Sequence, residues 1–111
     1  MQFYRQYLIL HTVKGLWLWP HQVLEDTGVA YRYLNGVCTL THVRSGLMIV
    51  ATPLPCEQDA MELCRRVARL ANWQHEVKDM QKIARRKKLK EKVLAEIAKS
   101  IGWLELEAIK C

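Results

Sequence analysis

The stretch 29-VAYRYL-34, 35-NG-36, 37-VCTLTHV-43 decides the fold of this 111-residue chain. Two runs that alternate apolar and polar side chains flank the Asn35-Gly36 dipeptide. An Asn-Gly pair in this setting favours a two-residue type I′ turn, because both central residues of that turn need a positive φ. The pattern therefore predicts an antiparallel hairpin in which Leu34 faces Val37.

Side chains along such a hairpin alternate between its two faces. The face that we expect in the core carries Val29, Tyr31, Tyr33, Cys38, Leu40 and His42. The face that we expect to be wetter carries Ala30, Arg32, Leu34, Thr39 and Thr41. A layer that covers the first face would complete a hydrophobic core.

Three further segments read as extended chain. Residues 3–13 are apolar on both faces, which is typical of a central strand covered on both sides. Residues 16–20 are a short apolar run that Pro20 is expected to end. Residues 47–52 predict the third strand of a meander, an interior one, which ends at Pro53 because proline cannot donate to a ladder. We therefore expect a sheet of three to four strands.

The hydrophobic period becomes helical after residue 56. An apolar stripe predicts a helix over 57–73 that lies across one face of the sheet. Residues 76–100 contain no glycine or proline and predict one uninterrupted helix about 37 Å long, which would wrap the domain, project from it or pair with another chain.

The predicted fold class is α+β: a small antiparallel β-sheet packed by one helix and followed by a long basic C-terminal helix. Residues 1–73 form the β-meander and its covering helix. Residues 74–111 form the basic helix and an apolar tail, either within the same domain or projecting from it.

The charge of the chain is concentrated in one segment. The net charge is +6, from 17 lysines and arginines against 11 acids. Residues 82–92 hold seven bases and one acid, which is also +6, so the rest of the chain sums to zero. A basic pI therefore reflects one element and not a generally cationic surface.

The sequence also bears on the cellular compartment. It lacks an apolar run long enough for a transmembrane helix, a secretory signal at its N-terminus and any CxxC pair among its four cysteines. We expect a cytoplasmic protein with reduced cysteines and no membrane contact. It would be nucleoid-associated, or nuclear in a eukaryotic host.

No catalytic or cofactor-binding motif is present. Cys38 and His42 would lie about 13 Å apart along one strand, too far for a nucleophile and its base. The histidines have no chelating spacing, and the glycines do not form a phosphate-binding loop. We therefore expect a protein that is not an enzyme and that has no metal site and no cofactor.

The basic segment is the best candidate for a binding site. The residues expected to bind are Lys82, Arg85, Arg86, Lys87, Lys88, Lys90 and Lys92, together with Arg65, Arg66 and Arg69 of the first helix. The leading hypothesis is a non-enzymatic nucleic-acid-binding accessory or regulatory protein that contacts the phosphate backbone. The alternative is a small inhibitor or adaptor whose basic helix occupies an acidic site on a larger protein. A merely solvated helix is the third reading.

Two weaker hypotheses concern apolar side chains. A stacking platform for single strands could use Tyr31, Tyr33, Trp17, Trp19 and Arg32, unless these aromatic residues belong to the core. An apolar set must be buried either against another copy of the chain in a homodimer, which we favour, or on the second face of the sheet: Val93, Leu94, Ile97 and Ile101 with Trp103, Leu104, Leu106 and Ile109.

Overall fold

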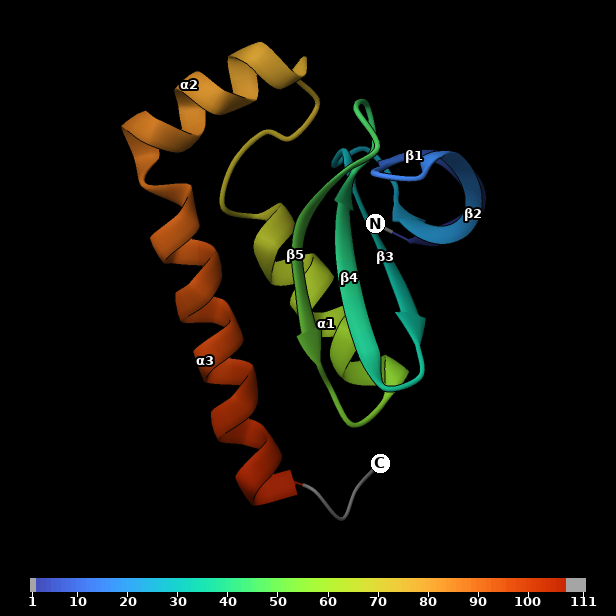
Figure 1. The fold of residues 1–111 in the computed structure, drawn as a ribbon. Coiled ribbons are helices and arrows are strands. Elements are labelled where there is room, and N and C mark those ends of the chain that lie inside the picture. Colours follow the sequence, from blue (N-terminus) through green and yellow to red (C-terminus); the bar gives the residue numbers. More distant parts are fainter. Residues whose placement is uncertain (1, 108–111) are drawn as a thin grey trace.

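The computed structural model describes the chain from residue 2 to 107, and the side chains from 2 to 10 and from 13 to 99. The fold is α+β, as predicted, with a five-stranded antiparallel sheet instead of the expected three to four strands. The strands lie side by side in chain order (Figure 1). The elements are β1 (Phe3–Thr12), β2 (Gly15–Leu24), β3 (Val29–Leu34), β4 (Val37–His42), β5 (Leu47–Pro53), α1 (Glu57–Ala68), α2 (Val77–Lys87) and α3 (Leu89–Glu107).

The hairpin of β3 and β4 has the predicted register. Leu34 pairs with Val37 and Val29 pairs with His42. The turn residues Asn35 and Gly36 have φ values of 52° and 78°, as a type I′ turn requires. The expected core face is buried, apart from a partly exposed Tyr33.

The wetter face was predicted wrongly at two positions. Ala30 and Thr41 are buried, because the β1–β2 ribbon curls back over that end of the sheet (Figure 1). Leu8 and Val23 pack on Ala30 in a second, smaller apolar cluster. Sheet curvature thus provides a cover that alternation along one hairpin cannot reveal.

The first two strands correct two further predictions. Pro20 does not end a strand: it lies inside β2, opposite Tyr7 of β1. It lies in the part of β2 that has no partner on β3, since β3 pairs only with residues 22–24. A missing N–H is tolerated at such a position. The strand expected to be central is β1, which lies at the edge of the sheet.

One face of the sheet is covered by α1, as predicted (Figure 1). Leu63, Cys64 and Val67 of this helix are fully buried in the main core. The helix ends at Ala68, earlier than expected. The chain then turns back, and the indole N–H of Trp73 donates a hydrogen bond to the Val67 carbonyl oxygen at 2.9 Å.

The predicted uninterrupted helix over 76–100 is wrong. The chain forms α2 and α3, which meet at Lys88 in the left-handed conformation (φ 53°, ψ 49°) and make a sharp bend (Figure 1). The bend has a packing reason. Met80 of α2 and Leu89 of α3 are both buried in the main core, and the long exposed basic run lies between them. A change of direction at Lys88 allows both apolar stripes to reach the same core.

Three smaller observations complete the fold. No helix in the described part of the chain is long and apolar enough to cross a membrane. Cys38 and Cys64 are free and buried, as expected. The expectation of reduced cysteines is wrong for Cys56, which is disulfide-bonded, and Cys111 lies outside the described residues.

Candidate binding site: a basic corner beside an apolar groove

The basic residues of 82–92 gather at the junction of α2 and α3, which we call the basic corner. The corner consists of Lys82, Arg85, Arg86, Lys87, Lys88, Lys90 and Lys92, and all seven side chains are exposed. Within the described residues, none of the seven forms an ion pair. No described residue therefore neutralises the positive charge of this junction.

The helix dipoles account for the cations of the corner that lie in the last turn of α2 but not for those that lie on α3. Arg85, Arg86 and Lys87 lie in the last turn of α2, where cations stabilise the helix dipole. Lys90 and Lys92 lie in the first turns of α3, where cations oppose the dipole and Glu91 is the acid of the first turn. Helix stability therefore does not account for the charges on the α3 side.

The three arginines of α1 have a different environment. Arg65 lies 3.6 Å from Glu62, and its guanidinium stacks over the Phe3 ring. Arg66 lies 3.5 Å from Glu62 and 3.7 Å from Glu96 of α3. Arg69 is exposed at the C-terminal cap of α1. The contacts of Arg65 and Arg66 thus hold α1 against β1 and α3.

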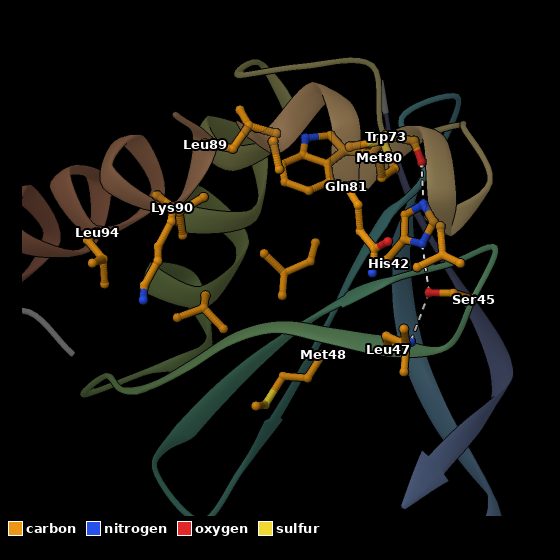
Figure 2. Close-up of a pocket in the computed structure, with 15 residues that line it drawn as sticks. His42, Ser45, Leu47, Met48, Trp73, Met80, Gln81, Leu89, Lys90 and Leu94 are labelled. Carbon is orange, nitrogen blue, oxygen red and sulfur yellow. Dashed lines mark hydrogen bonds between the residues drawn. The ribbon is translucent and has the colours of Figure 1, made fainter. Parts of the chain in front are cut away.

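An open cavity of about 390 Å³ lies next to the basic corner, between β5 and the helices α2 and α3. We call it the apolar groove. Residues 47–50 of β5 form one wall. Figure 2 shows Met48 on this wall, with Leu94 and Lys90 of α3 across from it and His42 and Ser45 at the opposite end. Among the described residues, Lys90 is the one lysine, arginine or acid that lines it.

The segment 69–76 connects α1 to α2 and is bonded to the sheet and its loops. The guanidinium of Arg44 donates to the Gln74 carbonyl oxygen at 2.9 Å and pairs with Glu76 at 2.6 Å. The Gln74 side-chain amide donates to the Asp26 carbonyl oxygen. Gly28 lies directly beneath this segment, and a Cβ there would be 2.6 Å from the carbonyl oxygen of Trp73.

The histidine that lines the groove, His42, is held by hydrogen bonds at both ring nitrogens. The His42 ring bonds to Ser45 Oγ at 2.7 Å and to the Trp73 carbonyl oxygen at 2.8 Å. Because a carbonyl only accepts, Nε2 carries a proton and donates it to the Trp73 oxygen. Neither ring nitrogen is directed to Cys38, whose thiol pKa burial raises to about 12. Among the described residues, no group of histidines, cysteines and acids could hold a metal ion.

The five residues of the predicted stacking platform do not share one environment, and Trp17 among them is 48% exposed. Tyr31 is buried in the core, and the Tyr33 hydroxyl donates to the Leu54 carbonyl oxygen at 2.7 Å. The Trp19 ring lies under the guanidinium of Arg32 at 4.8 Å. Tyr31, Tyr33 and Trp19 thus make contacts within the fold.

The apolar residues of the homodimer hypothesis that the structure describes are partly buried within the chain and partly exposed. Val93 and Ile97 are buried in the chain's own core, whereas Leu94 is half exposed in the groove. The side chains of Ile101, Trp103, Leu104, Leu106 and Ile109 lie outside the described residues.

Sequence reasoning missed the groove. Its β5 wall was expected to be an interior strand, and its helical wall exists only because the chain bends at Lys88. The exposed Leu47 and Met48 in a continuous apolar run could have suggested an edge strand with an apolar partner. No protein-family model, curated protein or solved structure was found to match this chain.

Proposed function

We propose that this protein is a non-enzymatic nucleic-acid-binding accessory or regulatory protein, whose basic corner contacts the phosphate backbone. One observation carries the proposal: seven exposed cations crowd around the α2–α3 junction without an ion-pair partner among the described residues. Phosphates that approach such a cluster release condensed counterions, and this release drives association. Contacts of this kind position a protein on nucleic acid without specifying sequence.

The test is the salt dependence of binding to a short DNA duplex, measured by fluorescence anisotropy. If the corner contacts about six phosphates, log K falls against log salt with a slope of about −5. Single strands give a shallower slope of about −4. Each replacement with Gln is expected to bring the slope closer to zero by about one, and the residues to replace are Arg85, Arg86, Lys87, Lys88 and Lys90. A scrambled duplex behaves like the first one.

A matched pair of variants separates the corner from net charge. Arg86→Gln/Lys87→Gln removes two cations from the corner, and Arg5→Gln/Lys99→Gln removes two exposed cations from β1 and the far part of α3. The corner variant is expected to bring the slope closer to zero by about two, and the control variant by much less. A slope near zero for the unaltered protein, or equal effects of the two variants, would defeat the proposal.

The second candidate function is that of a small inhibitor or adaptor that binds an acidic site on a larger protein. The apolar groove that borders the basic corner favours it, because a charged nucleic-acid backbone gains no favourable contact from an apolar wall. A protein partner releases no condensed counterion layer, so salt then acts mainly on the association rate. Recovery of a partner from host lysate that survives nuclease treatment would favour this candidate over the first.

A further inference from the structure

We propose that the apolar groove binds a short, extended protein segment whose apolar side chains enter the groove and whose acidic end lies at the basic corner. This site shares the basic corner with the phosphate contacts proposed above, but its apolar groove is a separate surface and its partner is a protein segment. The observations that carry it are the open edge of β5, the apolar walls of the groove and the position of the charges at one end.

The first observation is the free edge of the sheet. β5 is the last strand, and its ladder partners all lie on β4. Among the described residues, its outer edge has no strand partner. Such an edge offers backbone N–H and C=O groups to an incoming extended chain. A register shift between Leu40 and Thr41 leaves Ile49 without a residue opposite it, so any added ladder is short and the apolar contacts dominate.

The second observation is the chemistry of the walls. Three large apolar side chains that line the groove are exposed: Leu47 by 42%, Met48 by 64% and Leu94 by 51%. They project from opposite walls, two from β5 and one from α3 (Figure 2). The cavity volume of about 390 Å³ is within the usual range for ligand sites. Apolar side chains that enter this space remove apolar surface from water on both walls.

The third observation is the direction of the charge. Ala84, Leu89 and Lys90 line one end of the groove, and they flank the four consecutive cations of 85–88. The opposite end carries His42 and Ser45 and no charged lysine or arginine of the lining. An Asp or Glu at one end of the bound segment would therefore lie beside unpaired cations. Charge complementarity of this kind selects an acidic protein segment and sets its orientation.

A nucleic acid fits the groove less well. Its charged backbone would lose hydration against the apolar walls and gain one lysine inside the groove. The corner itself can still bind phosphate from the solvent side. The two partners can thus be separated by mutation.

The experiment selects binders from a displayed library of random peptides and measures the affinity of the selected consensus peptide by fluorescence anisotropy. The test variant is Met48→Gln/Leu94→Gln, which keeps the side chains long and makes both walls polar. The matched control is Ile9→Gln/Leu18→Gln on the β1–β2 ribbon, where the side chains are 56% and 62% exposed. All four positions are exposed, and thermal unfolding verifies that each variant is folded.

The selected peptides are expected to combine apolar residues with Asp or Glu at one end. The groove variant is expected to weaken the consensus peptide at least about tenfold, as loss of central interface contacts does, and the control variant by less than about twofold. Arg86→Gln/Lys87→Gln is expected to lower the affinity for the acidic consensus peptide. The affinity for a version of the peptide in which Gln replaces the acidic residues is expected to stay unchanged.

Several outcomes would overturn this inference. They are a library that yields no binder, a consensus without acids, or equal losses in the groove and ribbon variants. If the groove variant lowers the affinity for a DNA duplex as much as the affinity for the peptide, the groove is assigned to nucleic acid instead. The slope of DNA binding against salt reports separately on the proposed function, so either proposal can fail alone.

Discussion

The ring of His42 on β4 donates a hydrogen bond from Nε2 to the carbonyl oxygen of Trp73, 31 positions later in the chain, at 2.8 Å. Both residues line the apolar groove, and both are buried. The bond ties the segment before α2 to β4, at the end of the groove where His42 and Ser45 lie (Figure 2). The position of α2 therefore depends in part on one imidazole ring.

Replacing His42 with Phe is expected to lower the free energy of unfolding by about 1–3 kcal/mol, because the Trp73 carbonyl loses its donor in a buried place. Urea unfolding measures the change. Ser45→Ala is the comparison, since the Ser45 hydroxyl bonds only the other ring nitrogen and the Leu47 N–H among the described contacts. Equal costs for the two variants would show that the Trp73 bond has no special weight.

Gly28→Ala tests the closeness of the same segment. Its φ is +80°, and a Cβ would lie 2.6 Å from the Trp73 carbonyl oxygen. Gly36→Ala is a matched control, because Gly36 has φ +78° and nothing within 4 Å of a Cβ. Both variants are expected to carry the backbone strain of about 1 kcal/mol or more, and Gly28→Ala a steric cost in addition. Thermal unfolding midpoints that fall equally would contradict the close contact.

His21 is expected to make stability depend on pH. Burial lowers the pKa of this histidine, opposed by its hydrogen bond to the Trp19 carbonyl oxygen and assisted by the charge of Arg32. The unfolded chain then binds a proton more readily than the folded chain, so stability falls as pH drops below about 6.5. Urea midpoints from pH 8 to 5 measure this loss.

The matching variant is His21→Gln, which cannot titrate. It is expected to be less stable at pH 8, since it disturbs the bonds to Trp19 and Thr41, and to show a smaller loss towards pH 5. Parallel pH profiles for the two proteins would exclude His21 as the cause.

Lys88→Gly distinguishes the bend from a straight helix by the sign of its effect. At a left-handed residue, glycine relieves about 1 kcal/mol of strain, so the variant is expected to be more stable. In the interior of a continuous helix, the same change would cost about 1 kcal/mol relative to alanine. A lowered thermal midpoint with Lys88→Gly, compared with Lys88→Ala, would contradict the bend.

The parts of the fold that the sequence predicts are those with a local cause. The Asn35-Gly36 turn sets the register of β3 and β4, and the apolar stripe after residue 56 predicts α1. Pro20 misled because a proline ends a strand only where both edges are paired, and pairing is a property of the whole sheet. Lys88 misled because lysine has no intrinsic preference for the left-handed region, and only the burial of Met80 and Leu89 in one core imposes it there.

The candidate site divides along the same line. The order of residues alone locates the cations of 82–92, because counting charges along the chain requires no knowledge of the fold. The groove beside them is formed by β5, α2 and α3 together, and no single segment carries its pattern. Arg65 and Arg66 differ from the corner residues because both pair with Glu62 of their own helix, at a local i,i+3 or i,i+4 spacing. Only the contact of Arg66 with Glu96 needs α1 and α3 to pack together.

The segment 69–76 has a consequence for the order of folding. Each hairpin of the meander closes a short loop, whereas the bonds of Arg44, His42 and Gln74 join residues 30 to 48 positions apart. Long loops close at a higher entropic cost than short ones, so we expect the meander to assemble first and α2 to dock afterwards. Amide protons of β3 and β4 should then gain protection from exchange before those of α2 in a pulse-labelled refolding experiment. The groove would exist only in chains that have completed this last step, and a partner that binds there would select finished molecules from nascent ones.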